Sequence, residues 1–175
     1  RSQPFLEQFQ SYFPKLASIV CRGETRVNSL ATTYHPTDEE LPQIRKAVQI
    51  NENETFESLQ RVVIRGQVLC TKEYNESKAP STINHCFITE KKNEFYLVIK
   101  ILRLITSERV ILLCNKLMNC SKLPLNNGDT RNQLYFSYIW TFSNVASNLV
   151  YIPLDDFYDL ATYVTFDNAN YAFKI

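Results

Sequence analysis

Glycine and histidine are scarce in this chain of 175 residues, which holds three glycines and two histidines. Phosphate-binding loops need several closely spaced glycines, so the composition argues against a nucleotide site of that kind. The two histidines, His35 and His85, lie far apart and match none of the spacings typical of a zinc site. We therefore expect no cofactor and no bound metal.

Long apolar runs and an excess of one charge are also missing. No apolar stretch reaches the roughly 18 residues that a membrane-spanning helix needs, because Lys100, Arg103 and Glu108 interrupt the most apolar region. The 19 basic and 18 acidic residues leave a net charge of +1. Proteins held to nucleic acid by phosphate contacts usually have a basic excess. Nucleic-acid binding would therefore depend on a local basic patch, and we expect no membrane partner.

The cysteines do not form a recognisable disulfide framework. There are five of them: Cys21, Cys70, Cys86, Cys114 and Cys120. Their number is odd, no pair has the CxxC spacing, and several stand inside apolar runs. This pattern is typical of buried thiols in a reducing compartment. We expect an intracellular protein, in the nucleus or the cytoplasm. The sequence begins at Arg1 without a methionine, and we expect it to be part of a longer polypeptide.

Aromatic residues are abundant, with eleven Phe, ten Tyr and one Trp. Aromatic and β-branched residues favour strands. The hydrophobic fraction of 45% and the charged fraction of 21% are typical of a globular protein. A chain of this length can bury roughly two-thirds of its unfolded surface, which is enough for a substantial core.

Two helices are predicted near the start of the chain. Apolar residues recur at spacings of three and four over residues 5–20, and Pro14 is expected to kink or break this helix. A second helix is predicted over residues 37–49, with Thr37 as the cap and Glu40 three residues later. A polar link follows at residues 51–55. We predict an N-terminal helical segment, 1–55, and a β-rich domain, 56–175.

From Gln60 onward the hydrophobic period is that of strands. The most apolar part, Glu94 to Leu117, predicts a β-hairpin at the centre of a mostly antiparallel sheet, and its two apolar faces predict cover on both sides. A short helix is predicted over residues 154–163. The remaining predicted strands are 61–71, bent at Gly66, and 85–89, 133–142, 148–153 and 171–175. The predicted fold class is α+β: two N-terminal helices followed by a mostly antiparallel meander or a partly closed β-barrel.

Two groups of residues suggest an enzyme. Asp155, Asp156 and Asp159 form the densest acidic cluster, which could bind a divalent ion or transfer protons. Capping of the predicted helix explains the same residues more simply. Cys114 with His85 could form a nucleophile and its base, but Cys114 stands in an apolar run, where a thiol is usually buried. We assign no catalytic residue, and a small metal-dependent hydrolase or nuclease stays an alternative.

Two other groups suggest binding. Arg61, Arg65 and Lys72, with Tyr74 nearby, could contact phosphates and stack on bases. Charged residues that protect an exposed sheet edge are the simpler interpretation.

The aromatic strand around residues 135–142 could form a cage for a methylated lysine or a groove for a peptide, although aromatic residues at a period of two more often fill a sheet core. Its suspected binding residues are Tyr135, Tyr138 and Trp140.

The region around the predicted hairpin resembles a known family. Cys86-Phe87-Ile88, a polar turn, Phe95-Tyr96-x-Val98-x-Lys100-Ile101 and a strand from Val110 follow in the order seen at the start of bromo-adjacent homology (BAH) domains. Residues 61–175 also resemble the β-rich C-terminal module of zinc-finger and transposon-derived proteins of invertebrates, through Ile152-Pro153-Leu154 and a closing strand from Tyr171 to Ile175. The resemblance implies a chromatin- or protein-binding module, and no functional residue is carried over.

These observations predict a non-enzymatic intracellular interaction module that binds a protein partner, in a chromatin or nucleic-acid context. Besides the hydrolase or nuclease, a second alternative is a viral or mobile-element accessory protein whose aromatic surface captures a host factor. The oligomeric state is left open.

Overall fold

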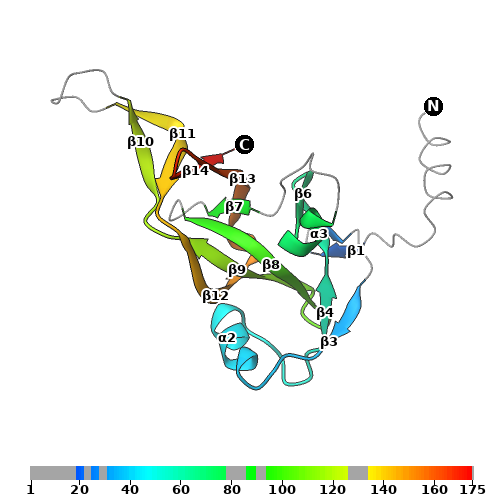
Figure 1. Ribbon diagram of the computed structural model, residues 1–175. Helices are drawn as coiled ribbons and strands as arrows, with labels where there is room; N and C mark the ends of the chain where they lie inside the picture. The colour runs from blue at the N-terminus through cyan, green and yellow to red at the C-terminus, as the bar shows by residue number, and fades with distance from the viewer. Residues whose placement is uncertain are drawn as a thin grey trace, which may run out of the picture.

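The computed structural model of the chain describes residues 19–21, 25–27, 31–77, 86–89, 94–125 and 134–174 (Figure 1). Most of them lie in strands. In chain order the strands are β1 (Ile19–Cys21), β2 (Thr25–Val27), β3 (Thr32–Tyr34), β4 (Phe56–Leu59), β5 (Arg61–Ile64), β6 (Gln67–Cys70), β7 (Cys86–Thr89), β8 (Phe95–Leu104), β9 (Arg109–Leu117), β10 (Ser121–Leu125), β11 (Leu134–Phe142), β12 (Val145–Pro153), β13 (Phe157–Phe166) and β14 (Ala169–Lys174). The helices in the described ranges are α2 (Glu40–Ala47), α3 (Lys72–Glu76) and the single 3₁₀ turn η1 (Leu154–Asp156).

Strand β8 is the spine of the larger sheet, and all pairings of that sheet are antiparallel. Strand β9 follows one edge of β8 along its length. The other edge is shared, because β7 pairs with the first half of β8 and β4 with the second half. Most side chains of β8 and β9 are buried. The predicted central hairpin, covered on both faces, is confirmed.

Alternation along β8, which changes phase at the register shift between Val98 and Lys100, divides the core between the two faces of the sheet. Tyr96, Val98 and Ile101 belong to one cluster. Phe95 and Leu97 belong to a second cluster around Trp140. Further along β8, Leu102 and Leu104 pack with Ile44 of α2 in a third cluster.

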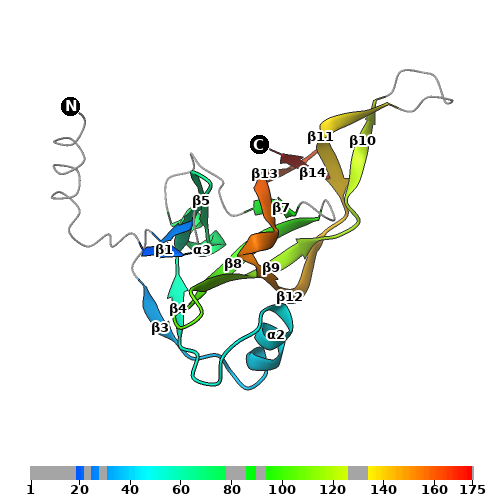
Figure 2. The same ribbon diagram turned by 180° about the vertical axis from the view of Figure 1, so that it is seen from behind.

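Two successive pairs of strands form one long antiparallel ribbon: β9 pairs with β12, and β10 pairs with β11. Leu117 is opposite Val145, and Ser121 is opposite Thr141. Between these pairs the backbone of Met118 bonds that of Asn144 at 2.8 Å and that of Ser143 at 2.9 Å, so the ladder continues through the bend. The β9–β12 half lies against β8, whereas the β10–β11 half continues into β14 and β13, as both views show (Figures 1 and 2).

The predicted fold class is wrong. In the described part of the chain the sheet is not closed into a barrel, and its strand order runs from β10 at one end to β3 at the other. Because β8 gives half of one edge to β4, the sheet extends outward through β4 and β3. Only one of the two predicted N-terminal helices is present in the described residues. Residues 19–21 form a strand, and the rest of the first predicted helix lies outside the described residues.

The second predicted helix is confirmed as α2, with the expected start. The Glu40 N–H donates to Thr37 Oγ1 at 3.3 Å, and the Thr37 N–H donates to Glu40 Oε2 at 2.9 Å. This reciprocal pair is a capping box. Ile44 is fully buried on the side of α2 that packs against the sheet.

Two other predicted elements are wrong. The strand predicted over residues 61–71 is a hairpin of β5 and β6, because Arg65 and Gly66 both take positive φ, 49° and 79°, and reverse the chain. The helix predicted over residues 154–163 is one 3₁₀ turn followed by β13. Pairing of β13 with both β7 and β14 outweighs the helix-start signal of the two aspartates.

Candidate functional site

An apolar groove crosses the outer face of the four-stranded part of the sheet formed by β10, β11, β14 and β13. It encloses about 340 Å³. The cross-strand register brings the lining side chains together, because Ile139 is opposite Phe173 and Tyr171 is opposite Val164. Each of the four strands contributes to the lining: Leu123, Ile139, Val164, Phe166, Tyr171 and Phe173.

The opposite face of three of these strands, β11, β13 and β14, is part of the core. Trp140 and Phe142 of β11, Ala161 of β13 and Ala172 of β14 are buried there. Successive side chains of a strand point to opposite faces, so Ile139, Tyr171 and their neighbours are directed outward. This part of the sheet is therefore apolar on both faces, and one face is open.

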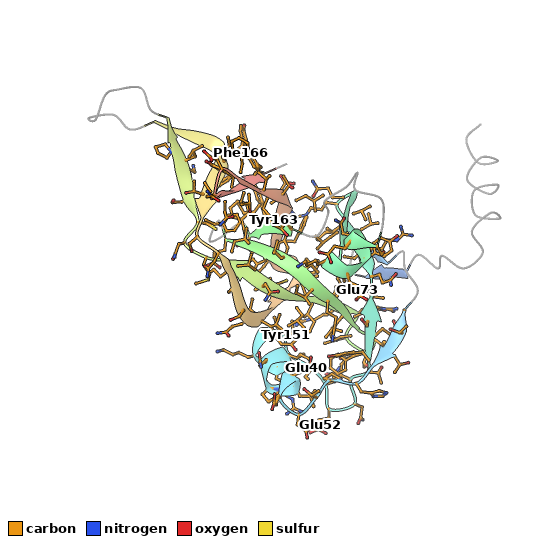
Figure 3. All side chains as sticks on the ribbon, in the orientation of Figure 1. Glu40, Glu52, Glu73, Tyr151, Tyr163 and Phe166 are labelled. Carbon is orange, nitrogen blue, oxygen red and sulfur yellow. The ribbon has the colours of Figure 1, made fainter. Side chains whose placement is uncertain are left out.

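Phe166 marks one end of the groove and is 70% exposed. It precedes the two-residue turn Asp167-Asn168, in which both residues have positive φ, 49° and 59°. Next to the turn, Thr165 Oγ1 donates to Asn170 Oδ1 at 2.7 Å, and Asn170 Nδ2 donates to the Ser143 carbonyl at 3.0 Å. Phe166 therefore projects from a braced hairpin end, well away from α2 (Figure 3).

Two of the predicted aromatic binding residues, Tyr138 and Trp140, differ sharply in exposure. Trp140 is only 5% exposed, and its ring meets that of Phe95 edge-on with centroids 5.0 Å apart. Tyr138 is exposed. Tyr135 lies in β11 opposite Pro124. Trp140 is thus a core residue, as the simpler interpretation of the stripe had it.

The groove residues of β11 and β13 were missed for two reasons. On β11, the polar-tipped aromatic residues were the predicted binding residues, whereas Ile139, between Tyr138 and Trp140, lines the groove. On β13, the predicted helix hid the period of two that places Val164 and Phe166 on one face. The alternation from Thr162 to Phe166 was the signal available in the sequence.

Three of the four residues of the predicted basic group lie close together. The Arg61 guanidinium is 5.7 Å from the centroid of the Tyr74 ring, and the Tyr74 N–H donates to the capping Thr71 hydroxyl. Lys72 forms an ion pair with Glu76 at 3.8 Å. Arg65 occupies the turn at the far end of the hairpin, about 13 Å along β5 from Arg61 at ~3.3 Å per residue. The basic group is therefore divided, and one of its cations is paired with a carboxylate.

The predicted acidic cluster is dispersed, because the helix that would have aligned it is not formed. Asp155 and Asp156 lie exposed in η1. Asp159 accepts from Gln67 Nε2 at 2.8 Å and pairs with Lys174 at 3.4 Å. Within the described ranges, no group of three or more His, Cys, Asp or Glu side chains could hold a metal ion.

The predicted nucleophile is deeply buried. Cys114 is inaccessible in the core, and burial raises the pKa of its thiol. His85 lies outside the described residues. A thiolate is the reactive form of cysteine, so this environment opposes nucleophilic chemistry at Cys114.

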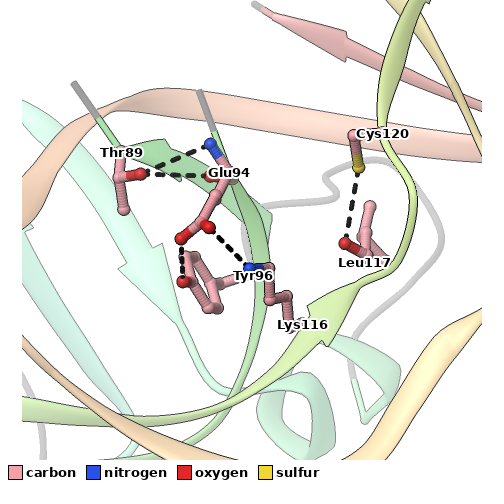
Figure 4. Close-up of polar contacts among 6 residues, drawn as sticks. All are labelled: Thr89, Glu94, Tyr96, Lys116, Leu117 and Cys120. Carbon is pink, nitrogen blue, oxygen red and sulfur yellow. Dashed lines mark hydrogen bonds and ion pairs between the residues drawn. The ribbon is translucent and has the colours of Figure 1, made fainter. Parts of the chain in front are cut away.

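Glu94 is the centre of a polar network that joins β8 to β9 (Figure 4). Its carboxylate accepts from the Tyr96 hydroxyl and from Lys116 Nζ, each at 2.5 Å. Burial, and next the hydrogen bond to Glu94, raises the pKa of Tyr96. The hydroxyl is thereby kept protonated as a donor, so the network fastens two strands and does not supply a base.

A second concavity of about 260 Å³ lies between β3, α2 and residues 50–56. Its lining mixes both charge signs, with His35 and Arg45 against Glu52 and Glu54. Glu54 Oε1 already accepts from the backbone N–H of Thr106 at 2.7 Å. The other oxygen of this carboxylate, Glu54 Oε2, is buried without a hydrogen-bond partner in the described part of the chain. The mixed charges of the lining do not select one class of ligand, so the groove is the stronger candidate.

No protein-family model, no curated protein and no solved structure matches the chain. The resemblance to BAH-like modules therefore stays a prediction. None of the helices in the described ranges is long and apolar enough to cross a membrane.

Proposed function

We propose that the chain is a non-enzymatic interaction module that binds a protein partner through the outer groove. The observation that supports this proposal is a continuous apolar surface on the open face of a sheet whose other face is already packed. Large apolar patches on protein surfaces commonly mark binding sites. An intracellular location and a chromatin context belong to the same proposal, and the chromatin context rests on the resemblance alone.

The energetics favour a binding role for the exposed end of the groove. Val164 and Phe166 are 46% and 70% exposed. Full burial of a Val or Phe side chain contributes roughly 1.5–3 kcal/mol relative to exposure. Aromatic side chains that fill a partner's pocket often dominate binding energy. Phe166 is the natural anchor for such a contact.

The proposal is tested by quantitative pull-down from extracts of the source cells, comparing wild type with Phe166→Asp. A buried aspartate without a partner is strongly unfavourable, so we expect proteins bound by the wild type to fall at least tenfold. Tyr138→Asp is the matched control, because Tyr138 is 66% exposed but does not line the groove. Equal recovery with wild type and Phe166→Asp would contradict the proposal.

The nucleic-acid alternative would depend on Arg61, Lys72 and Tyr74. Its test is duplex DNA binding at several salt concentrations, because phosphate contacts make affinity fall steeply with salt. Binding that is salt-dependent and lost in Arg61→Ala would favour this alternative.

The enzyme alternative is tested by divalent metal. A rise of several degrees in Tm that Asp155→Asn abolishes would favour a metal-dependent enzyme over the interaction module. The accessory-protein alternative would use the same groove, with a host factor as the partner.

A further inference from the structure

The groove matches a short segment in size. Six side chains line it, whereas a standard protein–protein interface uses about 20–30 residues on each side. Its four strands, spaced ~4.8 Å apart, span roughly 14 Å. Four or five extended residues cover that distance. A second copy of this folded chain would need far more contact area than the groove provides.

The chemistry of the lining excludes charged side chains from the occupant. None of the six lining residues carries a charge, and Tyr171 contributes the one hydroxyl. Cross-strand neighbours on the same face are the neutral Thr141 and Thr162. A charged side chain placed here would lose water without gaining an ion partner. The side chains that enter the groove should therefore be apolar.

The nearest sheet edge is poorly suited to adding a strand. Among the described residues β10 pairs only with β11, but Pro124 has no N–H to donate and the register shifts between Lys122 and Pro124. Proline, lysine and bulges are the features by which proteins protect their edges from pairing. Contact through side chains on the face is favoured over backbone pairing.

We infer that the groove binds a short linear segment of a partner protein, which inserts two bulky uncharged side chains between Leu123 and Phe166. In an extended segment, residues i and i+2 point to the same side, roughly 7 Å apart, so both fit within the groove. The braced turn after Phe166 lowers the entropy cost of binding. This inference rests on the proposed function and specifies the chemistry of the partner.

The test is selection of random 12-residue peptides, displayed on phage, on the immobilised wild-type chain. We expect enriched peptides to carry two large apolar residues with no charge between them. Their affinity should fall at least tenfold with Phe166→Asp and with Val164→Asp, and less than twofold with Tyr138→Asp. Circular dichroism verifies that each variant is folded, which the exposure of all three positions favours.

Three outcomes would overturn the inference. They are no enrichment, enrichment of charged peptides, and peptides that bind wild type and Phe166→Asp equally. A dimer seen by light scattering and dissolved by Phe166→Asp would assign the groove to a second copy instead. The proposed function is decided separately by the pull-down, so peptide selection can fail while groove-dependent capture of a folded partner succeeds.

Discussion

Glu40 shows how much of the fold depends on single polar side chains. It begins α2, and both of its carboxylate oxygens lie 2.7 Å from the Tyr34 hydroxyl. Lys100 Nζ donates to the same hydroxyl at 3.0 Å. Tyr151 of β12 approaches from the sheet (Figure 3). One carboxylate therefore caps the helix and fastens it to β3 and β12.

Replacement of this carboxylate should loosen α2. We expect Glu40→Gln to lower the free energy of unfolding by about 1–2 kcal/mol at pH 7, because hydrogen bonds to a charged acceptor are lost. Burial alone would raise the pKa of Glu40, but the hydrogen bonds from Thr37 and Tyr34 and the charge of Lys100 outweigh it and lower the pKa. Urea unfolding measures the difference.

The pH dependence of this effect has a definite sign. A carboxyl whose pKa is lowered by folding stabilises the protein above its unfolded pKa of about 4.3, and the contribution is lost as the pH falls through the folded pKa. The gap between wild type and Glu40→Gln should therefore shrink at pH 3. Glu39→Gln, at an exposed position beside it, is the control. A gap that widens in acid would contradict this assignment.

We expect the Trp140 side chain to stabilise the folded protein. Because its ring is buried against Phe95, Trp140→Ala should cost about 3–5 kcal/mol through the cavity it leaves. Trp140→Phe should cost less and leave binding at the groove unchanged. Chemical denaturation followed by circular dichroism gives the first result, and the pull-down gives the second. A stable Trp140→Ala variant that had lost its partner would restore Trp140 as a binding residue.

At the scale of elements, the turn between β5 and β6 decides the course of the chain. Positive φ at both Arg65 and Gly66 matches the two-residue turns that suit the twist of a hairpin. A Cβ at Gly66 would meet no atom within 4 Å. Only backbone strain therefore opposes a side chain at this position.

Gly66→Ala should lower the free energy of unfolding by about 1 kcal/mol, since alanine is strained at positive φ. Arg65→Asn should be neutral or slightly stabilising, because asparagine tolerates this conformation better than arginine. Urea denaturation of both variants measures the effect. Equal stability of wild type and Gly66→Ala would argue against the hairpin.

At the scale of the whole molecule, the reactivity of the cysteine thiols measures how often the core opens. Cys70, Cys86 and Cys114 are buried and Cys120 is partly buried. Burial raises the pKa of Cys86, Cys114 and Cys120. The native fold therefore suppresses the reactive thiolate at these three positions.

In a Cys21→Ser background, N-ethylmaleimide at pH 7 should label Cys86 and Cys114 at least tenfold more slowly in native buffer than in 8 M urea, because labelling requires the core to open. Mass spectrometry after timed quenching measures each site. Rapid labelling of Cys114 in native buffer would contradict the deduced burial, and would revive the nucleophile hypothesis.

The central hairpin was predictable because its pattern is local. Two apolar strands of nine or ten residues on either side of a short turn remove their side chains from water most simply by pairing with each other inside the core. The start of α2 was predictable for the same reason, since Thr37 and Glu40 lie within one turn of each other. The groove was not predictable, because its six lining residues come from two hairpins, β10–β11 and β13–β14, that meet only through the pairing of β11 with β14.

Sequence alone determined the period of the central hairpin, the cap of α2, the burial expected of Cys114 and the absence of a global charge excess. Tertiary structure decided the rest. Whether Leu154 to Phe166 became helix or strand depended on the pairing offered by β7 and β14, and whether the sheet closed depended on β4 taking half of the edge of β8. Which aromatic side chains face solvent depended on which face of the outer strands the core covers. These outcomes depend on contacts between distant segments, and local propensity does not encode them.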